Sequence, residues 1–173
     1  MNDFDYSAIG QRIKVLRKKK KLSQQELAVI IGKSLRTVQK YETGEIEVSI
    51  AVVNQLANVL DSTPTYIMGY EVDRTPIKNL ADIMSLLFRM DDVAGLNFDV
   101  DTKRPPRNPK WECSISFDGK SDAEFNTDIC LFLEEWQSQR ERYAEGKMSS
   151  EKYRKWQEET LAYYAATSVK TEE

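Results

Sequence analysis

The sequence of 173 residues contains no histidine. This absence excludes serine or cysteine catalysis with a histidine base, histidine-ligated zinc and histidine-based pH switching. Only two cysteines occur, Cys113 and Cys130, and they form no C-x-x-C motif, so they cannot complete a four-ligand metal site. We interpret both as reduced core thiols of a cytosolic protein, and we expect no metal or other cofactor.

Long apolar segments are also lacking. The longest unbroken apolar run, residues 161–166, is far shorter than the ~18 residues that a membrane span requires. The first five residues are acidic and contain no apolar signal region. We therefore expect a cytoplasmic protein without a membrane partner. Hydrophobic residues make up 40% and charged residues 31%, which is typical of one globular domain or two small ones.

Charge is distributed unevenly along the chain. Residues 1–70 carry 10 basic and 7 acidic side chains, whereas residues 71–173 carry 15 basic and 21 acidic ones. The contrast is strongest over residues 12–40, which contain 10 basic residues and a single acidic residue, Glu26. A local basic block on an acidic protein indicates that a polyanion binds at one place.

Residues 1–70 are predicted to form five short helices. Ile9, Ile13 and Leu16 recur with helical spacing in the first helix. Ser23 and Glu26 form a capping box that begins the second. The later helices are predicted to start at Ser34, Ser49 and Thr63-Pro64. Helix ends are predicted at Gly32, Gly44 and Gly69.

Residues 24–43 contain the main functional signal. Two helices joined by a tight turn that contains Gly32 are typical of a helix-turn-helix. Ala28 is small where the two helices must cross. The predicted shared core consists of Leu27, Ile31, Val38 and Tyr41.

These residues are similar to those of a known family. The motif LSQQELA at residues 22–28, Gly32, and SLRTVQKYETG at residues 34–44 resemble the helix-turn-helix of Cro and the phage repressors, also called the xenobiotic-response-element family. The likeness covers roughly residues 7–69. It implies a five-helix lambda-repressor-like domain in a transcriptional regulator that binds double-stranded DNA.

Helix geometry indicates which side chains would read the DNA. If Ser34, Val38 and Tyr41 are buried, the opposite face of their helix forms one stripe. The resemblance assigns this stripe to the major groove, where arginine and lysine donate to guanine, glutamine pairs with adenine, and leucine contacts a thymine methyl group. The stripe consists of Leu35, Arg36, Gln39 and Lys40.

Other candidates would hold the DNA backbone or orient a neighbour. Gln24 lies at a helix N-terminus, where backbone N–H groups favour an anion. The complete DNA-binding prediction comprises Gln24, Ser34, Leu35, Arg36, Thr37, Gln39 and Lys40, with further phosphate contacts from Arg12 and Lys33. The basic run at residues 17–21 has two compatible interpretations, a solvated helix end or a phosphate-facing segment.

The second half of the chain resembles no named family. Residues 71–79 are predicted to be a linker, and residues 80–173 an α+β dimerisation or effector domain of a helix, a β-hairpin and two amphipathic helices, so that the whole protein is mainly α. Alternation over residues 96–100 and 111–117 predicts two strands with one buried face each. We interpret residues 104–109 as a rigid hairpin connection rather than an extended recognition segment.

The sequence favours one function for the whole chain and leaves two alternatives. The leading hypothesis is a repressor that binds an inverted repeat as a homodimer, with half-sites ~34–36 Å apart, and with a small-molecule or protein effector at the C-terminal domain. The alternative is a DNA-binding antitoxin or phage-switch protein whose C-terminal domain captures a protein. Self-cleavage by Ser114 or Ser116 with Lys120 would need a β-rich scaffold, which this helical half lacks, so we expect no catalytic residues and no enzyme.

Overall fold

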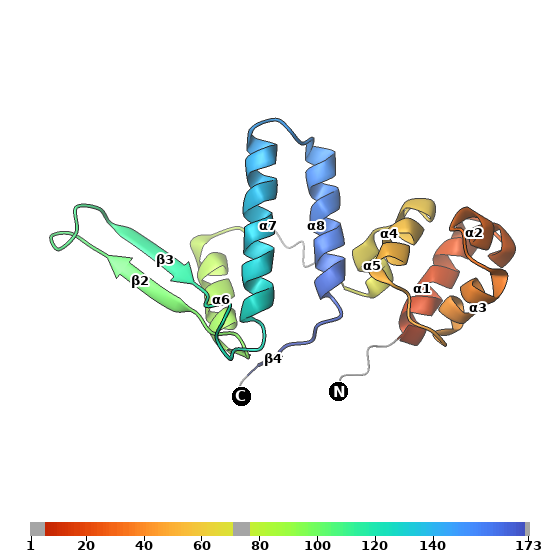
Figure 1. The fold of residues 1–173 in the computed structure, drawn as a ribbon, viewed down its shortest axis with the longest axis horizontal. Coiled ribbons are helices and arrows are strands. Elements are labelled where there is room, and N and C mark those ends of the chain that lie inside the picture. The colour runs from red at the N-terminus through yellow and green to blue at the C-terminus, as the bar shows by residue number, and fades with distance from the viewer. Residues whose placement is uncertain (1–5, 71–76, 172–173) are drawn as a thin grey trace. The chain divides into compact units, whose positions relative to one another are not determined.

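The computed structural model describes residues 6–70 and 77–171 (Figure 1). Contacts within the chain divide it into two units. The predicted linker at residues 71–79 falls mostly outside the described residues. The predicted fold class is confirmed: five N-terminal helices precede a helix, a two-stranded hairpin and two further helices.

The first unit contains six helices among the described residues. Five of them follow one another closely and match the five predicted from the sequence. Their bounds, with those of a sixth helix from the end of the chain, are α1 Tyr6–Lys19, α2 Gln24–Ile30, α3 Leu35–Thr43, α4 Ile50–Val59, α5 Pro64–Met68 and α8 Ser150–Tyr164.

Side-chain caps begin several of these helices where the sequence predicts them. The Glu26 backbone N–H donates to the Ser23 hydroxyl at 3.1 Å, and the Ser23 N–H donates to the Glu26 carboxylate at 2.7 Å, which completes the capping box. Thr63 accepts from the Tyr66 N–H at the start of α5. Ser49 occupies the N-cap of α4 but makes no side-chain cap hydrogen bond.

A single hydrophobic core holds α1 to α5 together. It includes every residue of the predicted helix-turn-helix core, with Leu27 and Ala28 fully buried. Gly10 lets α1 approach α3 closely, because a Cβ there would lie 2.8 Å from the Glu42 carbonyl oxygen. Gly44 ends α3 in the left-handed conformation at φ 73°, and a Cβ there would meet the Ser7 backbone at 2.6 Å.

Helix α8 differs from the predicted domain division, which placed it with the C-terminal residues 80–173. It packs on α5 and α4 within the first unit. Ala162 is completely buried, and the buried Thr65 hydroxyl donates to the Glu158 carboxylate at 2.6 Å. The small Ala162 and this long-range hydrogen bond explain the association, which helical periodicity alone cannot reveal.

The second unit combines helices with two small sheets. Strands β2 (Asp99–Lys103) and β3 (Glu112–Ser116) form the predicted antiparallel hairpin, with Val100 opposite Ile115, but the first strand lies three residues later than the predicted segment 96–100. The two-residue strands β1 (Val93–Ala94) and β4 (Lys170–Thr171) also pair, with Val93 opposite Thr171, and this pairing was not predicted. The elements are α6 Leu80–Asp91, β1 Val93–Ala94, β2 Asp99–Lys103, β3 Glu112–Ser116, α7 Asn126–Ala144 and β4 Lys170–Thr171.

The prediction of one buried face on each strand is wrong. Every residue of β2 and β3 is exposed. The alternation is real, because Val100, Cys113 and Ile115 lie on one face and Asp99, Asp101 and Ser114 on the other. No other described element of the unit covers the apolar face. Cys113 is therefore exposed rather than a core thiol, whereas Cys130 is half-buried.

A polar centre takes the place of a core in the second unit. Asn126 is the one buried residue among those described there. Its side chain accepts from the Asn97 N–H at 3.0 Å and donates to the carbonyl oxygens of Asn97 and Asp118 at 2.8 and 3.1 Å. These bonds tie the start of α7 to the segments that flank the hairpin.

None of the helices in residues 6–70 and 77–171 combines the length and the hydropathy that a membrane span requires.

Candidate nucleic-acid interface

Helices α2 and α3 are joined by a tight turn at residues 31–34. Gly32 takes φ 65°, and the Lys33 N–H returns to the Ala28 carbonyl oxygen at 2.9 Å, so the chain reverses within a few residues. Ser34 then begins α3 by accepting from the Thr37 N–H at 3.0 Å. This turn, together with the core beneath it, fixes the orientation of α3.

A buried ion pair also fixes α3. Arg17 of α1 donates through Nε to Oε1 of Glu42 at 2.5 Å and through Nη2 to Oε2 at 3.0 Å. Its third donor, Nη1, reaches the Leu22 carbonyl oxygen at 2.7 Å. Gln24, at the start of α2, donates to Oε2 of Glu42 at 2.8 Å. The network therefore links α1, α2 and α3 behind the exposed face of α3.

The network shifts the titration of both charged partners. Burial raises the pKa of Glu42, but the hydrogen bonds from Arg17 and Gln24 outweigh burial, and the net pKa of Glu42 lies below its usual range. The hydrogen bond to Glu42 raises the pKa of Arg17. Both side chains remain charged at neutral pH.

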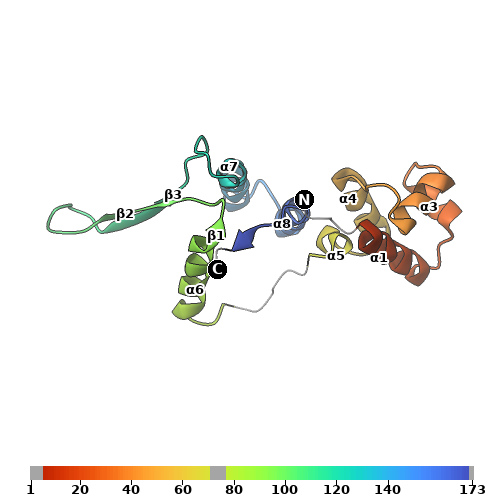
Figure 2. The ribbon, with the colours of Figure 1, turned by 90° about the horizontal axis from the view of Figure 1, so that it is seen from below.

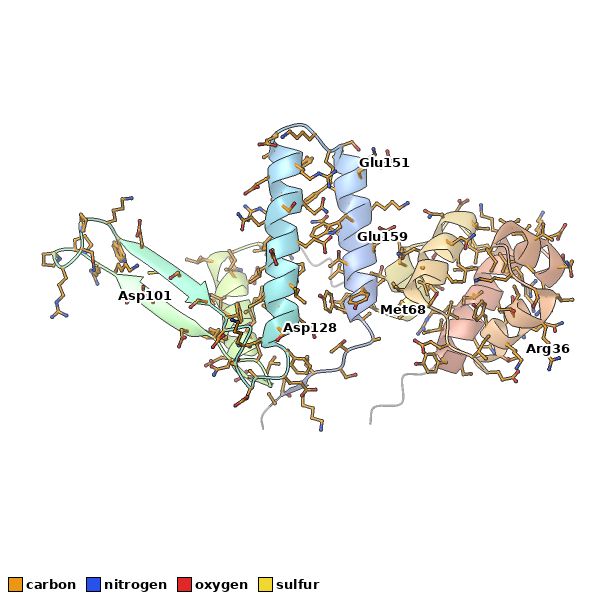
Figure 3. All side chains as sticks on the ribbon, in the orientation of Figure 1. Arg36, Met68, Asp101, Asp128, Glu151 and Glu159 are labelled. Atoms are coloured by element: carbon orange, nitrogen blue, oxygen red, sulfur yellow. The ribbon has the colours of Figure 1, made fainter. Side chains whose placement is uncertain are left out.

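The outer face of α3 carries the predicted base-reading side chains. Leu35, Arg36 and Gln39 are exposed, and Val38 is buried on the opposite side. Figure 3 shows Arg36 pointing away from the first unit. Ser34 is exposed rather than buried as predicted, because its hydroxyl caps the helix and contacts the Thr37 hydroxyl at 2.8 Å. An exposed Ser34 leaves the predicted stripe unchanged.

Lys40 is the most constrained member of the stripe. It is half-buried, and its Nζ lies 2.8 Å from Oε1 of Glu45. The Glu45 side chain is 60% exposed, so this ion pair is surrounded by solvent and contributes little to stability. Lys40 can therefore exchange Glu45 for a phosphate or a guanine at low cost.

Other predicted contacts lie in different places. Lys33 is exposed in the turn beside the start of α3. Arg12 lies instead against the end of α5, where a Cβ on Gly69 would meet its guanidinium nitrogen at 2.5 Å. Arg17 is only 8% exposed, so this member of the basic run has a structural role, while Lys20 pairs with Asp61.

The sequence analysis missed the roles of Arg17 and Glu42. Arg17 looks like its four basic successors, and nothing in the run distinguishes it. Glu42 did leave a signal: it follows the buried Val38 by four residues, which places it on the inner face of α3. An acid on that face needs a buried cation, and α1 supplies it.

Comparisons with known proteins match parts of this chain. Residues 13–67 match the family model described as helix-turn-helix. Antitoxin PezA from Streptococcus pneumoniae is 28% identical over 104 residues, which cover 53% of this chain and 66% of that protein. The chain thus spans just under two thirds of the length of this relative.

Two solved structures are similar to part of the chain. The restriction-modification controller protein C.AhdI from Aeromonas hydrophila is 36% identical, with 36% of this chain and 96% of that chain covered at a TM-score of 0.35. The clp gene regulator ClgR from C. glutamicum is 19% identical, with 42% of this chain and 95% of that chain covered at a TM-score of 0.36.

Proposed function

Because residues 13–67 match the helix-turn-helix family model, we propose that this protein is a sequence-specific transcriptional repressor that binds DNA through this segment. It binds duplex DNA in the cytoplasm and represses by occupying a promoter. It has no enzymatic activity and uses no cofactor. The observation that carries this proposal is the exposed face of α3, with Arg36 and Gln39 directed outward from a buried core.

The face of α3 suits the major groove. A helix fits that groove, and arginine and lysine side chains donate to guanine O6 and N7. Arg36 and Lys40 are one helical turn apart, so both can reach base edges on the same side. Gln24 is held by Glu42 at the start of α2, from which it can contact a phosphate or support the neighbouring side chains.

The second unit supports a homodimer on an inverted repeat. Helix α6 has no buried residue, and its exposed apolar side chains include Phe88 at 70% and Leu80 at 64%. Exposed apolar surface of this kind marks an interaction site. Pairing two copies would place two α3 helices in half-sites ~34–36 Å apart.

A selection from random duplexes with the full-length protein tests the proposal. We expect an enriched palindrome at near-physiological salt. Arg36→Ala with Lys40→Ala should weaken binding to that site at least about 30-fold, because each base contact contributes ~1–3 kcal/mol, while salt-sensitive non-specific binding persists. Lys18→Ala with Lys19→Ala is the matched control, since it removes two exposed cations outside α3.

The control separates base reading from general charge. The Lys18 and Lys19 variant should select the same sequence as the native protein. If the Arg36 and Lys40 variant also selects that sequence, α3 is not the recognition helix. If the native protein enriches no sequence, the proposed function is wrong.

A second candidate function has support of its own. Antitoxin PezA is similar to about half of this chain, and the exposed apolar side chains of α6 would suit a protein partner as well as a second copy. In this hypothesis, the second unit binds the protein product of a neighbouring gene while the first unit binds DNA. Co-expression with such a gene would yield a stable complex, and disruption by Phe88→Asp would locate its interface on α6.

A further inference from the structure

The connection between β2 and β3 is strongly basic. Residues 102–111 contain four cations, Lys103, Arg104, Arg107 and Lys110, and no acid. We call residues 103–111 the basic tip. The rest of the segment 77–149 carries six basic and fourteen acidic side chains. A cationic loop on an acidic unit indicates a local anionic partner.

The cations of the basic tip are available to a ligand. All four are exposed. The Nζ atoms of Lys103 and Lys110 lie 3.4 and 3.6 Å from carboxylates of Asp101 and Glu112, in pairs whose side chains are all at least 55% exposed. Such solvated pairs exchange readily for phosphate.

An aromatic side chain stands within this cluster. The Arg104 guanidinium lies 4.7 Å from the ring centre of Trp111, and Trp111 is 68% exposed. Both residues adjoin the last pair of the hairpin, Lys103 opposite Glu112, and the cation–π contact orients the guanidinium. Pro105 and Pro106 restrict the backbone between the two arginines, and Pro109 restricts it between Arg107 and Lys110.

The hairpin gives the basic tip reach. Within the second unit, β2 and β3 run as a two-stranded ribbon away from α6 and α7 (Figures 1 and 2). Both faces of the ribbon are exposed. A two-stranded ribbon of this kind fits a DNA groove. Arginine and proline at its end suit the minor groove, because the negative potential of that groove attracts arginine and proline can be inserted between base steps.

We propose that the basic tip is a second DNA-contacting element, which binds phosphates and the minor groove of the same duplex that α3 reads. The proposal rests on the proposed function of the first unit. Cationic contacts to the backbone add affinity without base preference. The tip therefore strengthens binding and lengthens the protected sequence, while α3 determines which sequence is chosen.

The experiment compares the native full-length protein with Arg104→Ala, Arg107→Ala and Lys110→Ala combined. Equilibrium binding to the selected duplex is measured at several salt concentrations between 50 and 200 mM. Each lost phosphate contact lowers the salt slope by about 1, so we expect a slope smaller by about 2–3 and binding weakened about tenfold or more. The selected sequence should not change, and the hydroxyl-radical footprint should become shorter.

Two further variants make the result specific. Lys120→Ala, Arg142→Ala and Lys147→Ala combined remove the same charge from exposed positions of the second unit outside the tip, and this variant should keep the native slope and footprint. Arg104→Lys with Arg107→Lys retains the charge and should retain most of the slope. A slope that falls in the triple alanine variant but not in this variant is then due to the missing charge. Single substitutions Arg104→Ala and Arg107→Ala, each expected to lower the slope by about 1, test the inference if the triple alanine variant folds poorly.

The outcomes separate the two claims. If the tip variant keeps the native slope and footprint while the Arg36 and Lys40 variant loses specific binding, the proposed function stands and the tip does not contact DNA. Binding of the tip to an acidic protein in place of DNA would also overturn the inference. If both triple variants lose slope equally, the effect is general charge and the inference is wrong. If the native protein binds no duplex, both claims fail.

Discussion

The two units of this chain differ in how they are held together. The first unit buries a continuous core of fifteen apolar residues and one ion pair beneath the candidate DNA-reading face. In the described part of the second unit, Asn126 is the one buried residue, while large side chains of α6 and the hairpin remain exposed. Burial of apolar surface is the main stabilising force in folding. The first unit is therefore held together by its own buried core, whereas the apolar side chains of α6 and the hairpin in the second unit stay exposed to solvent.

The largest effect should come from the buried ion pair of the first unit. Glu42→Gln leaves Arg17 charged and without its carboxylate, and we expect a loss of about 3–5 kcal/mol in the free energy of unfolding. Glu45→Gln, which breaks the exposed pair with Lys40, should cost no more than about 1 kcal/mol. Urea denaturation measures both. Equal losses would show that burial does not distinguish the two pairs.

The loss of stability at low pH tests the same ion pair without a substitution. The pKa of Glu42 is lowered in the folded protein, so the unfolded state binds more protons where the two pKa values differ. Stability is then fully present above the unfolded-state pKa of glutamate and is lost as pH falls through the lower folded-state value. Denaturation between pH 7 and pH 2 should show this loss. If Glu42→Gln lost the same amount of stability at low pH as the native protein, the loss would be due to other carboxylates.

A pair of leucines compares the two units directly. Leu56 is 1% exposed in the first unit and Leu87 is 38% exposed on α6. Leu56→Ala should cost about 2–5 kcal/mol, whereas Leu87→Ala should change the unfolding free energy of the monomer by about 0.5 kcal/mol or less. Denaturation at low protein concentration gives both values. A large cost for Leu87 that grows with protein concentration would place it in a homodimer interface.

The first unit could be predicted in detail because its local signals agree with one another. Capping residues such as Ser23 and Ser34 mark helix starts, and the spacing of Leu27, Val38 and Tyr41 identifies the buried stripe. Each signal spans a few residues, and the matching family pattern covers the same segment. The ion pair of Arg17 with Glu42 was missed because its partners are 25 positions apart.

The second unit could be predicted only as a list of elements. Alternation correctly indicates two strands, although the first lies three residues later than predicted. It indicates which face is apolar and not what covers that face. The packing of α8 on α5 depends on the small Ala162 and on the bond between Thr65 and Glu158, which are 93 positions apart. Long-range contacts of this kind leave no periodic trace in the sequence.

The hydrogen bonds of Asn126 should contribute less to the free energy of unfolding than the hydrophobic core of the first unit does. Asn126→Ala removes the partner of both backbone groups of Asn97, and we expect a local loss of about 1–3 kcal/mol. Hydrogen exchange of the Asn97 amide measures it. Asn108→Ala, in the hairpin connection, is the matched control and should leave that amide unchanged. Unchanged exchange in Asn126→Ala would mean that the hairpin flanks are held by something else.

The smallest effect compares two helix starts within the first unit. The Ser23 hydroxyl accepts the Glu26 N–H, and the Ser23 N–H lowers the pKa of Glu26 by donating to its carboxylate. Ser49 occupies the same position of α4 without a side-chain cap bond. Ser23→Ala should therefore cost about 1 kcal/mol, and Ser49→Ala clearly less. Since both serines precede short helices on one core, equal losses in thermal unfolding would show that the N-cap position matters here and the cap hydrogen bond does not.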